Sequence, residues 1–219
     1  MVKNMNFMLE VKHFSVPMAI VDYIPVLCFA IAAVILMRDL YNKMSKGAFA
    51  LFAAGVIDVT MAGALKATYK LLYALGVCDF QPLNNMFFPV QSIGFLLAGI
   101  GILAMLVYPQ QEKKLNSVAA PAVFTGTFVF VGLMVAGLGI LDAALCVLAK
   151  KLGKPGLIAL FVFSFVCCLG MGYLSSKDFA EASMNWIAEG VNVVGQGTLL
   201  AGVIILHKNG LADLTLEKK

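Results

Sequence analysis

The sequence predicts an all-α integral membrane protein with six transmembrane helices, and three observations support this. Of its 219 residues, 61% are hydrophobic and only 13% are charged. Soluble domains carry about 25% charged residues, so this chain cannot cover a globule in water. Its mean hydropathy is +0.93, and its apolar residues form six runs long enough to cross a bilayer. Because lipid cannot satisfy the edges of an open sheet, these runs are predicted to be helices.

The six spans follow one another with short polar or Pro- and Gly-containing loops between them. A polar segment at residues 1–14 precedes them and is predicted to be a short interfacial segment. The first apolar run starts late and is long, so we interpret it as a span and not as a cleaved signal peptide. A polar tail, 207–219, follows a single domain, 15–206, whose predicted spans are 15–37, 48–75, 84–108, 119–149, 155–175 and 181–206.

Short matches suggest that the two halves of this domain, 15–108 and 119–206, are related. They occur in the same order and at similar spacing: KMSKG (43–47) with KLGKP (151–155), ALF (50–52) with ALF (159–161), and LLAGIGIL (96–103) with LLAGVIIL (199–206). Chance is the alternative, since Leu, Ala and Gly are common in any span. Three alternating spans in each half would make the repeats inverted, a frequent transporter design with its site near the midplane.

Lysine and arginine give a weak signal for orientation. They are slightly more numerous on the side that would hold both termini and the second and fourth loops. The positive-inside rule then predicts that both termini are cytoplasmic, and we expect the plasma membrane as the location. Because the excess is small, insertion in both orientations stays an alternative.

The sixth span carries a polar stripe with helical spacing, formed by Glu181, Asn185, Glu189, Asn192 and Gln196. Such a stripe cannot face hydrocarbon without a penalty of several kcal/mol for each unsatisfied group. We therefore expect it to face protein or a water-filled cavity. For Asn192 and Gln196, hydrogen bonds that only hold helices together are the alternative.

The second span places two opposite charges, Asp58 and Lys66, on one broad helix face. Counted from the span centres at about 1.5 Å per residue, Lys66 lies at the depth of Asp22, Gln91 and Asp142. We expect Lys66 to pair with Asp22 or Asp142, which form a supporting charge layer. Asp58 lies near the bilayer centre without an obvious cation, so we expect it either to find a partner or to bind a proton.

Each of these charges also has a purely structural interpretation. Lys66 can extend its apolar stem and reach the interface. Asp22 and Asp142 can be polar groups at helix ends, within reach of lipid headgroups. Asp58 is the hardest to explain in this way, because it lies closest to the centre of its span.

The sequence argues against several functional classes. The two histidines, His13 and His207, lie at the outer ends of the helical region, so we expect neither a metal centre nor a histidine-dependent nucleophile inside the membrane. We expect no cofactor. Four of the five cysteines lie in apolar runs and are interpreted as small buried hydrophobes. No basic run or zinc motif indicates nucleic-acid binding.

These patterns predict a small membrane transporter or channel for a polar small molecule or ion. Its central polar cavity would be lined by the second and sixth spans, and no catalytic residue is assigned. The expected partners are the lipid bilayer and a small polar or ionic ligand, while a homo-oligomer or a partner subunit stays open. The alternatives are a ligand-binding sensor or docking subunit, and a lipid-modifying enzyme that uses Asp and Glu. The predicted ligand- or ion-binding residues are Asp58, Lys66, Gln91, Glu189, Asn192 and Gln196.

Overall fold

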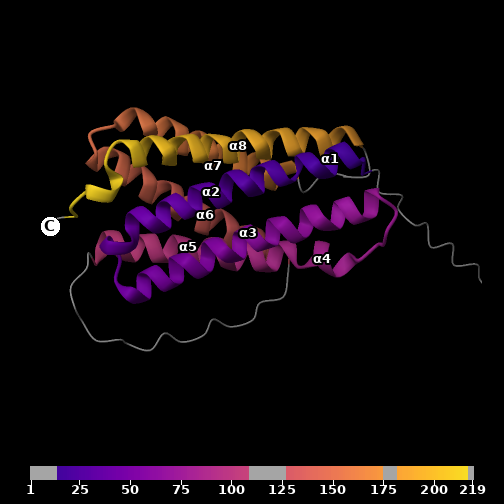
Figure 1. Cartoon of the computed structure of the whole chain (residues 1–219), viewed down its shortest axis with the longest axis horizontal. Helices are drawn as coiled ribbons and strands as arrows, with labels where there is room; N and C mark the ends of the chain where they lie inside the picture. The colour runs from indigo at the N-terminus through magenta and orange to yellow at the C-terminus, as the bar shows by residue number, and fades with distance from the viewer. Residues whose placement is uncertain (1–13, 109–126, 175–181, 217–219) are drawn as a thin grey trace, which may run out of the picture.

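A computed structural model describes residues 14–108, 127–174 and 182–216, which form helices and no strand (Figure 1). The all-helical class is therefore confirmed for this part of the chain. The helices are α1 (Val16–Val21), α2 (Tyr23–Leu40), α3 (Lys46–Ala74), α4 (Gln81–Asn85), α5 (Phe87–Val107), α6 (Thr127–Lys151), α7 (Ile158–Leu174) and α8 (Ala182–Lys208). Three short 3-10 turns accompany them: η1 (Tyr41–Lys43), η2 (Pro155–Leu157) and η3 (Leu211–Asp213).

Six helical segments in the described part are long and apolar enough to cross a membrane. They match the six predicted spans and support an integral membrane protein. They run over Val16–Lys43, Lys46–Ala74, Gln81–Val107, Phe130–Lys151, Pro155–Leu174 and Ser183–Lys208. The predicted interfacial segment lies outside the described residues except for Phe14, as do Glu181 and the predicted start of the fourth span.

Local sequence explains where the first helices begin and end. Ser15 caps α1, because its side chain accepts a hydrogen bond from the backbone N–H of Met18. Pro25 has no N–H to donate to the carbonyl four residues earlier, so α1 ends at Val21 and Asp22 lies at the break before α2. Ser45 caps α3 in the same way as Ser15 caps α1.

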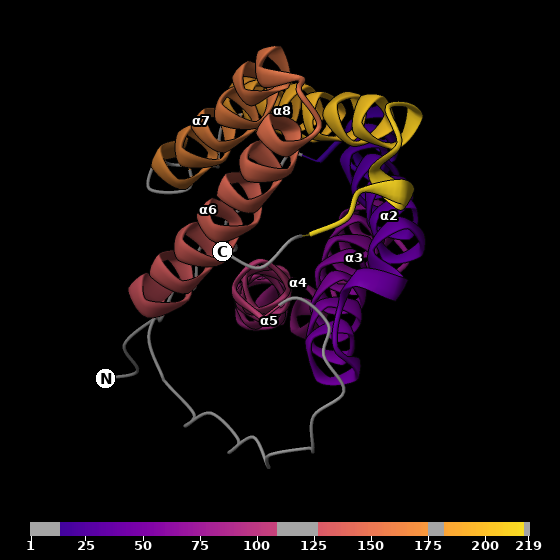
Figure 2. The ribbon, with the colours of Figure 1, turned by 90° about the vertical axis from the view of Figure 1, so that its left-hand side faces the viewer.

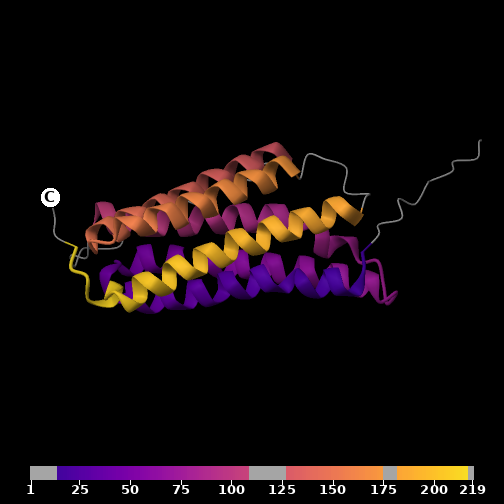
Figure 3. The ribbon, with the colours of Figure 1, turned by 90° about the horizontal axis from the view of Figure 1, so that it is seen from above.

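The long helices pack in a closed ring that follows the chain order (Figure 2). Each packs against the next, and α8 closes the ring by contacting both α7 and α2; Figure 3 shows it running between them. Glycines allow the closest approaches. A Cβ atom at Gly55 would overlap the backbone of Gly94 and Ala98, and one at Gly137 would overlap the backbone of Phe95 and Leu96.

Helix directions follow from contacts at the two ends of the bundle. One end of the bundle holds α4, and we call it the α4 end. There, Asp22 and Glu189 both contact Lys70. At the other end, the η3 end, Asp39 contacts His207. The first contact joins the beginning of α2 to the first half of α8, and the second joins the ends of the two helices. The two helices therefore run in the same direction.

The same reasoning applies to α5 and α6. Helix α5 packs antiparallel to α3, and α6 turns tightly through η2 into α7, which packs antiparallel to α8. Helices α5 and α6 are therefore parallel: α5 ends at the η3 end, and α6 ends there as well. The predicted inverted arrangement is wrong, because it assumed that every span reverses direction. Both halves run the same way. Helix α1 and the yellow segment that follows α8 lie at opposite ends of the bundle (Figure 1), so the described part of the chain does not support the prediction that both termini share a side.

The apolar core fills the η3 half of the ring. Its largest fully buried side chains include Phe52, Met105, Leu145, Leu148 and Phe161. The segment after α8, predicted to be a polar tail, packs here: Leu211 is fully buried, and the Lys43 ammonium donates to the carbonyl oxygens of Ala212 (2.7 Å) and Leu214 (2.6 Å).

Candidate functional site

A cavity of about 850 Å³ lies between the helices in the α4 half of the bundle. Its walls come from all six spanning segments and from α4. The lining includes four charged side chains: Asp22, Lys66, Lys70 and Glu189. Few ionisable side chains are found inside membrane proteins, so this concentration marks the cavity as the candidate site.

Lys70 is the centre of a buried charge cluster. Its Nζ lies 2.9 Å from Oδ2 of Asp22 and also donates a hydrogen bond to Oε1 of Glu189. All three residues are at least 93% buried, and they come from the α1–α2 break, from α3 and from α8. Desolvating three charges is costly, so the cluster persists only because each carboxylate faces the same ammonium.

Lys66 lies one turn before Lys70 on α3, and its surroundings differ. Its ammonium lies 3.9 Å from the centre of the Phe87 ring and 6.0 Å from that of Phe88. Among the described residues no carboxylate forms an ion pair with it. An aromatic face stabilises a cation only weakly.

Carboxamide side chains add hydrogen-bonding groups to the cavity. They come from α4, α5 and α8 and comprise Asn84, Asn85, Gln91, Asn185, Asn192 and Gln196. Two buried acceptors on α8, Oε2 of Glu189 and Oε1 of Gln196, have no hydrogen-bond partner in the described part of the chain. A buried acceptor without a partner is costly, so both atoms favour a bound molecule or water that donates to them.

Five of the six predicted ligand residues line the cavity: Lys66, Gln91, Glu189, Asn192 and Gln196. Asn185, another member of the predicted stripe, lines it as well. Asp58 is not in the lining. It is half-buried and lies beside the exposed Ile57 and Met61 on the outer side of α3. The sequence predicts Asp58 and Lys66 on one broad face of the helix. The angle between them around the helix axis is large enough for only Lys66 to face the cavity.

The predicted charge layer is wrong in its pairing. Asp22 pairs with Lys70 and not with Lys66. Lys70 was not among the partners expected from the sequence. Asp142 is buried on α6 outside the cavity lining, and neither of its carboxylate oxygens has a hydrogen-bond partner among the described residues. Its predicted depth depended on α6 running antiparallel to α5, which it does not.

Sequence reasoning missed Lys70, the two asparagines of α4 and the aromatic pair Phe87 and Phe88. A signal for Lys70 was available, because Lys66 and Lys70 are four residues apart and share a helix face. Nothing in the sequence predicted that α4 would place Asn84 and Asn85 in the cavity lining.

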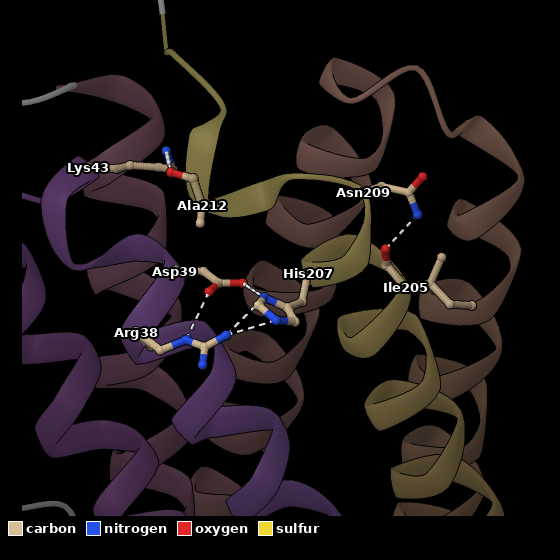
Figure 4. Close-up of polar contacts among 7 residues, drawn as sticks. All are labelled: Arg38, Asp39, Lys43, Ile205, His207, Asn209 and Ala212. Carbon is tan, nitrogen blue, oxygen red and sulfur yellow. Dashed lines mark hydrogen bonds and ion pairs between the residues drawn. The ribbon is translucent and has the colours of Figure 1, made fainter.

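A second polar cluster joins the ends of α2 and α8 at the η3 end (Figure 4). Nδ1 of His207 donates to Oδ2 of Asp39 at 2.7 Å, and the Arg38 guanidinium donates to Nε2 of the same ring at 2.8 Å. Nε of Arg38 also lies 3.5 Å from Oδ1 of Asp39. This arrangement fits a neutral imidazole with its proton on Nδ1. The cluster fixes α8 to α2 where the core is packed.

Within the described residues, no group of three or more His, Cys, Asp or Glu side chains is placed to hold a metal ion. The five cysteines are free. Comparison of the chain with protein-family models, curated proteins and solved structures finds no match. The site is therefore interpreted from its own geometry.

Proposed function

We propose that the protein is a membrane carrier for a small polar or ionic molecule that binds in the cavity of the α4 half. The observation that supports this is a cavity of about 850 Å³ whose walls hold two lysines and two carboxylates within spanning helices. Small-molecule sites typically measure about 300–1,000 Å³. Ionisable groups inside a membrane protein typically line substrate or ion pathways.

The asymmetry between the two halves of the bundle also supports a carrier. The α4 half contains the cavity, while the η3 half is filled by the apolar core and closed by the Arg38–Asp39–His207 cluster. A cavity in one half and a packed core in the other correspond to what is expected of one state of an alternating-access cycle. Two three-helix halves that run in the same direction are a known transporter design.

In this proposal the cavity residues provide different chemical groups for binding the ligand. Glu189 has one oxygen on Lys70 and one free, so it can take up a proton or a donor group of the ligand. The carboxamides of Gln91, Asn192 and Gln196 supply neutral hydrogen bonds. Asp58 has no role in this proposal, because its side chain lies outside the cavity.

Uptake by the purified protein in liposomes tests the proposal. The probe is a defined equimolar mixture of organic acids, amino acids, amines and nucleosides, with accumulated compounds measured by mass spectrometry. We expect at least one class to accumulate at least fivefold over empty liposomes. Glu189→Gln should reduce that uptake at least tenfold, while Asp58→Asn should keep it within twofold. No accumulation, or equal losses in both variants, would contradict the carrier.

A further inference from the structure

We propose that the molecule bound in this cavity carries an anionic group, a carboxylate or a similar oxyanion, and that the Lys66 ammonium holds it. The proposal rests on the proposed function, in that it takes the cavity as a ligand site. It goes further by naming the charge of the ligand and the residue that recognises it.

The two lysines of the cavity are the basis of this inference. Lys66 and Lys70 are one turn apart on α3 and both line the cavity. Lys70 contacts both Asp22 and Glu189. Lys66 has an aromatic ring at 3.9 Å and no carboxylate within ion-pair distance among the described residues. Among the described residues, Lys70 is therefore in direct contact with two carboxylates, and Lys66 is in direct contact with none.

An ammonium group has three N–H donors, and the face of one ring cannot satisfy all of them. Among the described residues no carboxylate pairs with Lys66, so its remaining donors can bind a group in the cavity. An oxyanion is the chemical group that meets this need with both charge and hydrogen bonds. The amides of Asn84, Asn85 and Gln91, which also line the cavity, offer N–H donors to the same anion.

A cationic ligand fits the site less well. Both carboxylates in the lining already contact Lys70, so a cation would share them with a buried ammonium and would find only Oε2 of Glu189 free. The apolar part of the lining suits the body of an organic anion, since Phe29, Phe87, Phe88 and Phe95 contribute aromatic rings. An organic anion with a small apolar body matches both features.

A charge-matched series of probes tests the proposal. Two frames, pentyl and 3-phenylpropyl, are each presented as carboxylate, alcohol and amine to the protein in lipid nanodiscs, and binding is measured by titration. We expect the carboxylate to bind at least tenfold more tightly than the alcohol and the amine of the same frame. Lys66→Gln should remove this preference, and Lys66→Arg should restore it. Asp58→Asn, outside the cavity on the same helix, should leave it unchanged.

Several results would overturn the inference: an equal or stronger binding of the amine, a carboxylate preference that survives Lys66→Gln, or no binding of any of the six probes. Uptake of the same probes into liposomes separates it from the carrier proposal. Uptake of an amine or alcohol with no preference for the carboxylate would support the carrier and overturn the anion site. Binding of the carboxylate through Lys66 without uptake of any compound would support the anion site and contradict the carrier.

Discussion

The two ends of the bundle are built from the same helices but differ in how they treat polar groups. At the α4 end, Asp22, Lys70 and Glu189 are buried beside a cavity. At the η3 end, Asp39 is buried beside a half-exposed His207 and a packed apolar core. The first arrangement keeps charges and space inside a membrane-spanning region. The second arrangement holds two helices together with no such cavity. The same helices thus line a cavity at one end of the bundle and form a packed core at the other.

The two ends of the bundle should face opposite sides of the membrane. Labelling from each side should give the largest effect among these predictions. Tags attached beside the described first and last residues, Phe14 and Leu216, should react with impermeant reagents from opposite sides. The expected result is complete labelling of one tag and none of the other in sealed vesicles. Equal labelling of both tags from one side would contradict the parallel arrangement of α2 and α8.

Removing the cation of the buried cluster should destabilise the α4 end strongly. Lys70→Met leaves Asp22 and Glu189 buried without their partner, and breaking a buried ion pair costs about 3–5 kcal/mol. The free energy of unfolding in mixed micelles measures this. The matched control is Lys66→Met, one turn away on α3, which breaks no ion pair and should cost less than half as much. Equal costs for the two variants would contradict the description of the cluster.

Close backbone contact between α5 and α6 gives a smaller effect. Gly137→Ala would place a Cβ atom against the backbone of Phe95 and Leu96, and overpacking costs about 1–3 kcal/mol. Gly132→Ala on the same helix meets open space and should be neutral or stabilise by up to about 1 kcal/mol. Gly137→Ala should therefore lower the unfolding free energy, while Gly132→Ala should leave it unchanged or raise it. A neutral Gly137→Ala would show that α5 and α6 do not pack closely.

The η3 end should give an effect no larger than that of Gly137→Ala. Asp39→Ala removes the buried acceptor of His207 and the contact with Arg38, and we expect a loss of about 1–3 kcal/mol. Asn209→Ala, whose side chain bonds only to the carbonyl oxygen of Ile205 on its own helix, should change the unfolding free energy by less than about 0.5 kcal/mol. Similar effects from both would mean that this cluster does not hold α2 to α8.

The sequence predicted the helical class and all six spanning segments, because long apolar runs permit little else. It also predicted the polar stripe on α8, since helical spacing alone decides which residues share a face. It could not predict the direction of α6, because no local signal in the sequence shows that α5 and α6 run in the same direction. The predicted ion pair of Asp22 was wrong for a similar reason. Whether Asp22 contacts Lys66 or Lys70 depends on the orientation of α3 about its own axis, which no local signal gives. The outward position of Asp58 likewise follows from packing and not from composition.

Cysteine accessibility measures the central claim most directly, namely that the cavity in the α4 half is open to water while the η3 half is closed. In a variant without native cysteines, Asn192→Cys lies in the cavity lining, and Val203→Cys lies in the core, about three turns further along α8. A water-soluble thiol reagent applied from the side of Phe14 should label Asn192→Cys at least tenfold faster than Val203→Cys. Equal rates, or faster labelling of Val203→Cys, would contradict the account.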